Sequence, residues 1–212
     1  MKFIVFSMYR AGSSMLVSAI NGHTPGLCLG EIFGTEGKSG PRGIELATNH
    51  RTDGGMTIKY KHYEVHEWIR NNIKDWKVIH IYREDVLAHA LSVYRFHNRL
   101  GPNHSISEVN ALKIEPKSDI IKAWMNYIEE RLQFFRKELQ NSGCQVLDIS
   151  YEEITNGINI QEFPEKQSYK ICDFLEIGKK ILRTGYHKTV PDKLSDHIIN
   201  IDKIKKEINE TT

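Results

Sequence analysis

Residues 2–16 read KFIVFSMYRAGSSML and combine an apolar run, a polar turn and a second apolar pattern. The consecutive apolar residues 3–6 predict a strand that is buried on both faces, as in a parallel sheet. Apolar residues then recur at positions 15, 16, 19 and 20, which is helical spacing. We therefore expect a strand, a short loop and a helix at the start of the chain.

The loop between this strand and helix has the composition of an anion-binding turn. The first N–H groups of a helix lack partners, and the helix dipole favours negative charge there. Arg10 adds a positive charge, and Gly12 allows the backbone to approach a ligand closely. Ser13 and Ser14 add hydroxyl donors. A serine-capped helix after an ordinary turn is the alternative interpretation.

The rest of the chain alternates strands and helices. We expect further strands at 56–60, 78–82 and 145–149, and helices near 62–73, 85–99, 118–140, 167–177 and 192–209. Residues 21–55 are rich in glycine and are expected to be irregular. This order predicts an α/β fold, a three-layer parallel sheet with helices on both faces and ligands at the carboxyl ends of its strands.

A second candidate anion site lies where the strand at 78–82 runs into a helix. Arg83 follows the strand, Asp85 is placed to cap the helix, and Ser92 lies about two turns further on. An arginine fork and a hydroxyl suit a phosphate, although a surface arginine and a buried helical serine would give the same pattern. The first and third predicted strands can be neighbours, so the two sites together suit a nucleotide with phosphates at its 5′ and 3′ positions.

Four segments resemble the sulfotransferases that use 3′-phosphoadenosine 5′-phosphosulfate (PAPS). Residues 7–16 are similar to their 5′-phosphosulfate loop, and residues 82–92 are similar to their 3′-phosphate motif. In spacing, the second motif resembles most the small bacterial glycolipid and trehalose-type enzymes, which usually have glutamine where His89 stands. Residues 29–33 resemble the Gly-Glu-x-Phe stretch of that group, and residues 150–154 resemble the family's Tyr-Glu-x-Leu segment.

The resemblance implies a P-loop-NTPase-like sulfotransferase fold and transfer of a sulfuryl group from PAPS to a hydroxyl acceptor, expected to be a carbohydrate or glycolipid. The product would be adenosine 3′,5′-bisphosphate, and no metal is implied. Glu31 would be the catalytic base, and Lys59 could touch the sulfate or the acceptor. The residues expected to bind the donor are Arg10, Ala11, Gly12, Ser13, Ser14, Arg83, Ser92, Tyr151 and Lys188.

Several alternatives remain open at the level of sequence. His23 and His80 are rival bases, although His80 is expected to be packed within its strand. His62 and His66 share a helix face, but they lack the third ligand that a zinc site needs. A P-loop-type nucleotide kinase is disfavoured, because a Walker A motif has its lysine after the last glycine of the loop. A nucleotide-binding module without catalysis is the remaining rival.

Composition limits the other expectations. The 212 residues suit one domain over 1–212, and a net charge of +2 is too small to indicate a nucleic-acid partner. The sequence has no apolar stretch long enough for a membrane span, and its three widely spaced cysteines predict no disulfide framework. We therefore expect a cytoplasmic protein. The amphipathic C-terminal helix could pair two copies into a homodimer or cover the core of one.

Overall fold

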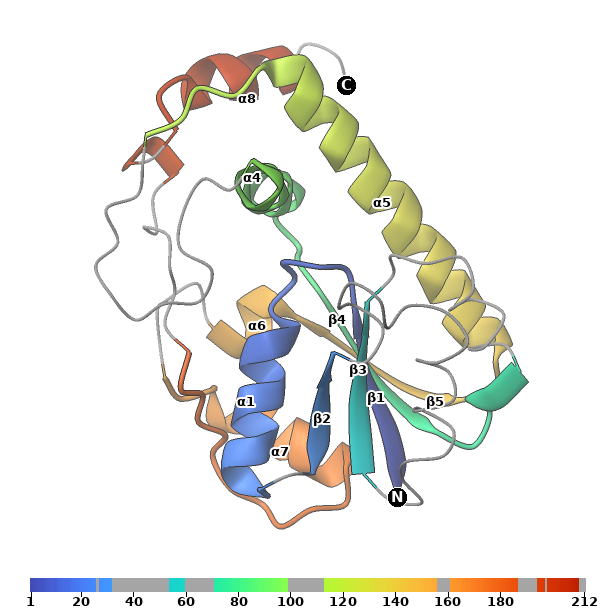
Figure 1. Cartoon of the computed structure of the whole chain (residues 1–212). Helices are drawn as coiled ribbons and strands as arrows, with labels where there is room; N and C mark the ends of the chain where they lie inside the picture. The colour runs from blue at the N-terminus through green and yellow to red at the C-terminus, as the bar shows by residue number, and fades with distance from the viewer. Residues whose placement is uncertain are drawn as a thin grey trace.

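The structure is a computed structural model that describes residues 1–25, 27–31, 54–59, 71–98, 113–155, 161–186, 194–196 and 198–209. Five parallel strands form one sheet in the order β2-β3-β1-β4-β5 (Figure 1). The strands are β1 (Lys2–Ser7), β2 (Cys28–Glu31), β3 (Gly54–Lys59), β4 (Lys77–Tyr82) and β5 (Gln145–Ser150).

Alternate residues of the central strands pack into two separate hydrophobic cores, one on each face of the sheet. Phe3 and Val5 of β1 pack with the helices of one face, which are α1 (Ser13–His23), α6 (Tyr151–Thr155) and α7 (Glu165–Phe174). Ile4 and Phe6 join the other core, which includes α4 (Val86–His97), α5 (Ser118–Asn141) and α8 (Ile201–Asn209). The period of two in a strand separates these two sets, so helices cover both faces of the sheet. The predicted three-layer α/β class is confirmed.

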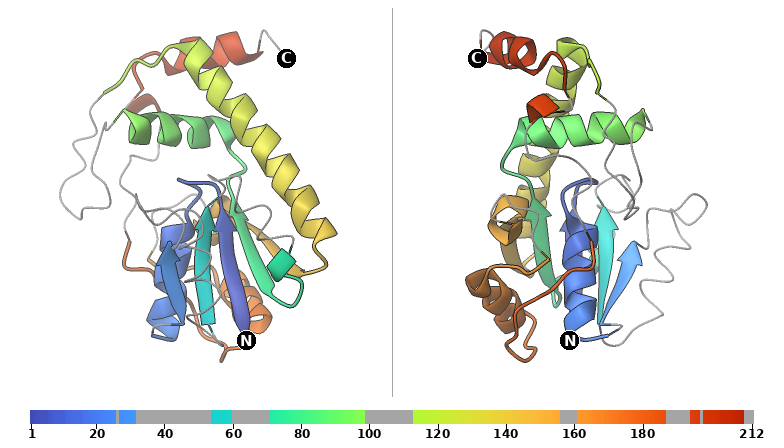
Figure 2. Two further views of the ribbon diagram at one scale, coloured as in Figure 1. Left: turned by 45° about the vertical axis from the view of Figure 1, so that its right-hand side comes forward. Right: turned by 90° about the vertical axis from the view of Figure 1, so that its left-hand side faces the viewer.

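Helix α4 lies beyond the carboxyl ends of the strands and packs against α5 (Figures 1 and 2). It begins at the predicted cap, where the Asp85 side chain accepts a hydrogen bond from the Ala88 amide at 2.8 Å. Because β1 pairs directly with β4, the loops that follow these two strands emerge side by side beneath α4. The first and third predicted strands correspond to β1 and β4, so the prediction that they can be neighbours is confirmed.

Two expectations about secondary structure are wrong. The segment expected to be irregular contains β2, a short edge strand that pairs with β3 with a register shift. The single helix expected over 192–209 is instead a 3₁₀ turn (Leu194–Asp196) followed by α8. The break occurs because Ile198 forms a bridge with Ile114, and the Ile199 amide donates to the Ile114 carbonyl at 2.9 Å.

Of the predicted helix at 62–73, only residues 71–73 are described, and the helical pair at 71–72 agrees with it. The long helix α5 matches its predicted range, and Gly143, in the left-handed region at φ 72°, follows its end. Cys28, Cys144 and Cys172 are free thiols.

Within the described ranges, no helix is both long enough and apolar enough to cross a bilayer.

The contact between Gly55 of β3 and Phe3 of β1 gives a test of the core. These residues are paired across the strands, and a Cβ at Gly55 would lie 2.1 Å from Cζ of the buried Phe3 ring. We expect Gly55→Ala to lower the free energy of unfolding by about 1–3 kcal/mol through overpacking, measured by urea denaturation. Gly178→Ala is the matched control, because nothing lies within 4 Å of its Cβ position. Equal stabilities of the two variants would contradict this packing.

Candidate functional site

The loop after β1 has an uncapped helix N-terminus. Arg10 and Gly12 both adopt left-handed backbone angles, with φ of 65° and 101°. Gly12 is the N-cap residue of α1, and no side chain among the described residues caps the helix. The serine-capped interpretation is therefore wrong. The first amides of α1 remain directed out of the helix, which is the arrangement that binds anions.

Helix α4 holds this loop from above. The Arg10 Nε donates a hydrogen bond to the Ser92 Oγ at 3.3 Å, and the Arg10 guanidinium lies 5.7 Å from the centre of the Phe96 ring. One turn earlier on α4, the His89 Nε2 lies 3.0 Å from the Tyr9 carbonyl oxygen. The two sequence motifs, about 80 residues apart, therefore meet through side chains of Arg10, Ser92 and His89.

Arg83 approaches the same loop from the end of β4. Its guanidinium lies 4.2 Å from the centre of the Tyr151 ring, on which it stacks. The Tyr151 ring also lies close to Gly12, where a Cβ would lie 2.6 Å from the Tyr151 Cδ2. Tyr151 therefore contacts both the loop and Arg83, and a side chain at position 12 would collide with its ring.

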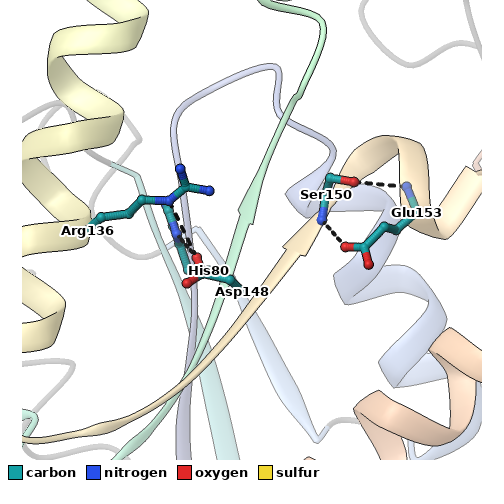
Figure 3. A network of polar contacts seen from close by, with 5 residues as sticks. All are labelled: His80, Arg136, Asp148, Ser150 and Glu153. Carbon is teal, nitrogen blue, oxygen red and sulfur yellow. Dashed lines mark hydrogen bonds and ion pairs between the residues drawn. The ribbon is translucent and has the colours of Figure 1, made fainter.

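A capping box fixes the position of Tyr151 (Figure 3). The Glu153 amide donates to the Ser150 Oγ at 3.0 Å, and the Ser150 amide donates to the Glu153 Oε2 at 2.8 Å. Tyr151 follows this N-cap directly and is the first residue of α6. The neighbouring Glu152 accepts a hydrogen bond from the Glu84 amide at 2.9 Å, which ties α6 to the segment that carries Arg83.

A second polar network joins β4, β5 and α5 next to the site (Figure 3). The His80 Nδ1 lies 2.6 Å from the Asp148 Oδ1, between residues that are paired in the sheet. Arg136 of α5 lies 3.9 Å from the same carboxylate and stacks on Tyr82 at 4.3 Å. The hydrogen bond from His80 lowers the pKa of Asp148, and burial lowers the pKa of His80. His80 is fully buried, as expected from its place in the strand, and it braces the strand that ends at Arg83.

The site carries positive charge that the described residues do not neutralise. Burial lowers the pKa of Arg10, and the charge of Arg83 lowers it further. Burial likewise lowers the pKa of Arg83, although the Tyr151 phenol and the Glu152 and Asp85 carboxylates raise it, and its buried Nε has no hydrogen-bond partner among the described residues. Neither guanidinium forms an ion pair with a carboxylate in the described part of the chain. Both groups stay protonated at neutral pH. A bound anion between them would therefore offset the cost of burying the two charges and weaken their repulsion.

His89 is a neutral histidine within this cationic site. Burial lowers its pKa to about 4, opposed by the bond to Tyr9 and assisted by the charges of Arg83 and Arg10. The sequence did not identify His89 as a site residue, although its spacing of three from Ser92 places both side chains on one face of a helix. A second signal was its place within the motif at 82–92, where the resembled enzymes usually have glutamine.

The lowered pKa of His89 predicts a dependence of stability on pH. Between pH 6.5 and about 4 the unfolded chain binds a proton at this residue and the folded chain does not, so stability falls as the pH falls. At pH 5 this loss is about 2 kcal/mol. We expect His89→Gln, which cannot titrate, to lose correspondingly less stability between pH 7 and pH 5 in urea denaturation. Parallel losses in both proteins would contradict a neutral buried His89.

The structure describes the other residues predicted for the site only in part or not at all. Glu31 ends β2, and Lys59 ends β3 in register with Ser7, the last residue of β1; only their backbones are described. Lys188, His62 and His66 lie outside the described residues. No cluster of metal-binding side chains is present among the described residues.

His23 lies at the opposite end of α1 from the loop. Its ring nitrogens contact the Thr24 Oγ1 at 2.9 Å and the Gly178 carbonyl oxygen at 2.5 Å. With both nitrogens engaged and a helix length away from Gly12, it is unsuited to act as a base at this site. The structure therefore argues against His23 as a rival to Glu31.

The parallel sheet with helices on both faces is an α/β fold that is similar to a solved sulfotransferase structure. A solved structure of mouse sulfotransferase SULT7A1 complexed with PAP is similar to this chain, with a TM-score of 0.52 and 16% sequence identity. The match covers 84% of this chain and 59% of that one, so the chain spans less than two thirds of its structural neighbour. Neither the family models nor the curated protein sequences compared with the chain gave a match.

Proposed function

We propose that the protein is a sulfotransferase that uses PAPS as its donor and a hydroxyl group, on a carbohydrate or glycolipid, as its acceptor. The observation that carries the proposal is the pair of buried arginines after two neighbouring strands, Arg83 stacked on Tyr151 and Arg10 bonded to Ser92, with no ion pair to a carboxylate among the described residues. Two separate cations, each beside polar donors, suit a ligand with two separate anionic groups. Adenosine with phosphates at both its 5′ and 3′ positions has that arrangement.

The 5′ end of the donor would bind at the loop. Arg10 and the amides of Gly12, Ser13 and Ser14 would hold the 5′-phosphosulfate, and Ala11 lies in the same turn. Sulfuryl transfer is an in-line displacement comparable to phosphoryl transfer, in which positioning and charge stabilisation do most of the catalysis. Charge accumulates on the oxygen of the leaving 5′-phosphate, where Arg10 and the helix N-terminus would stabilise it.

The 3′-phosphate would bind between the end of β4 and α4. Arg83 would supply its guanidinium, whose buried Nε has no partner among the described residues. Ser92 would supply its hydroxyl from α4. Because Ser92 also accepts from Arg10, it would link the two phosphate sites. Tyr151, stacked under Arg83, would lie near the adenine, and Lys188 would close the donor site.

The acceptor would approach from the β2 and β3 side of the loop. Glu31 would remove the proton of the acceptor hydroxyl while the oxygen bonds to sulfur and the bond from sulfur to the 5′-phosphate breaks. Lys59, level with the last residue of β1, would contact the sulfuryl group or the acceptor. No metal takes part in this scheme.

The rival functions predict different behaviour. A P-loop-type nucleotide kinase needs a lysine after the last glycine of its loop, and Ser13 stands there instead. Magnesium-dependent hydrolysis of ATP would favour that rival. Binding of adenosine 3′,5′-bisphosphate without sulfuryl transfer to any sugar or alcohol would favour a nucleotide-binding module without catalysis.

Arg83→Met tests the 3′-phosphate site. We expect the affinity for adenosine 3′,5′-bisphosphate to fall roughly 10- to 150-fold, because a charge-assisted contact is lost, as measured by isothermal titration calorimetry. The affinity for adenosine 5′-phosphosulfate, which lacks the 3′-phosphate, should change much less. The control is Arg183→Met, since Arg183 is exposed and paired with Glu162. Equal effects of Arg83→Met on both ligands would contradict the assignment.

Glu31→Gln tests the base. We expect turnover with labelled PAPS and a responsive acceptor to fall by roughly 10²–10⁴-fold, because the amide cannot accept the proton. The affinity for adenosine 3′,5′-bisphosphate should be unchanged in the same preparation. Turnover close to that of the unmodified protein would remove Glu31 from the mechanism.

A further inference from the structure

His89 is a buried histidine that the proposed transfer reaction does not use. It lies on the second turn of α4 and is 2% exposed. Its Nε2 lies 3.0 Å from the carbonyl oxygen of Tyr9, and its Nδ1 is buried without a partner in the described structure. Both motif arginines act on it electrostatically, so it lies inside the charged site.

The hydrogen bond fixes the tautomer of this histidine. A carbonyl oxygen can only accept, so the Nε2 carries the hydrogen and the Nδ1 carries a lone pair. A second proton would place a third positive charge beside Arg10 and Arg83. His89 therefore acts as a neutral donor to the backbone of the loop, a role that an uncharged amide could also fill.

The bonded carbonyl belongs to the peptide that sets the loop conformation. Arg10 follows it directly and has a φ of 65°, which is an unfavourable angle for a residue other than glycine. Such a backbone persists only where surrounding contacts hold it. Two of the contacts that hold this one are the His89 bond to the Tyr9 carbonyl and the Arg10 bond to Ser92, both from α4.

We propose that His89 is a positioning residue, which holds the Tyr9–Arg10 peptide so that Arg10 and the free amides of α1 face the 5′ group of the nucleotide. This inference rests on the proposed function and extends it. Without the bond, the peptide can rotate out of its left-handed angle and carry the Arg10 side chain away from Ser92. The cost then appears in binding of the 5′ group and not in binding of the 3′-phosphate.

The test compares His89→Leu, which lacks a donor, with His89→Gln, which keeps an N–H group. We expect His89→Leu to weaken binding of adenosine 3′,5′-bisphosphate about tenfold, the factor expected for one hydrogen bond, and His89→Gln to restore it. Binding of adenosine 3′-phosphate should be the same in all three proteins. In an Arg10→Met background, His89→Leu should have a smaller further effect than in the unmodified protein, because the part of its effect that passes through Arg10 is already lost.

Three results would overturn the proposal: unchanged binding in His89→Leu, an equal loss in His89→Gln, or an equal loss for adenosine 3′-phosphate. A separate measurement needs neither ligand nor variant. Nitrogen-15 NMR of the histidine rings should find the hydrogen of His89 on Nε2, and a hydrogen on Nδ1 would also overturn the proposal. If the unmodified protein bound neither nucleotide while the tautomer was as expected, the proposed function would fall and the bond to Tyr9 would stand.

Discussion

The site depends on the burial of two guanidinium groups, those of Arg10 and Arg83, in segments that the sheet brings together. Arg83 follows β4, Arg10 lies in the loop after β1, and these strands are paired, so the sheet keeps the two segments adjacent while contacts from α4 hold Arg10 in place. Partial compensation comes from the Tyr151 ring under Arg83 and from the Ser92 hydroxyl beside Arg10. Neither contact supplies negative charge. A preformed cationic pair of this kind is stabilised most by a ligand that is itself anionic at two points.

Rigid neighbours maintain this arrangement in the absence of a ligand. The His80–Asp148 bond and the Ser150–Glu153 capping box fix the ends of β4, which pairs with β1, and of β5, which pairs with β4. Helix α4 then lies over the loop and holds it through His89 and Ser92. Because these contacts come from three different elements, the geometry of the cationic pair does not depend on any one loop.

Local patterns in the sequence were sufficient for the parts of this site that are local in the chain. The apolar run before Arg10 predicts the first strand. The cap at Asp85 predicts the start of a helix, and the spacing to Ser92 places that residue on it. Contacts across the fold could not be predicted in this way. The bond from His89 to Tyr9 requires the orientation of α4 over the sheet, and the break before α8 requires the pairing of Ile198 with Ile114. The stack of Arg83 on Tyr151 likewise joins residues from different strands.

The order of the strands divides the proposed chemistry between two halves of the sheet. The residues proposed for the nucleotide follow β1, β4 and β5, whereas those proposed for the acceptor, Glu31 and Lys59, end β2 and β3. The loop after β1 lies between the halves, and it is the segment where the sulfuryl group would be held. A change to the acceptor half could therefore alter the acceptor without disturbing the arginine pair, because the two halves share only β1. This separation gives a physical reason why the residues proposed for the nucleotide could be assigned from the sequence while the identity of the acceptor could not.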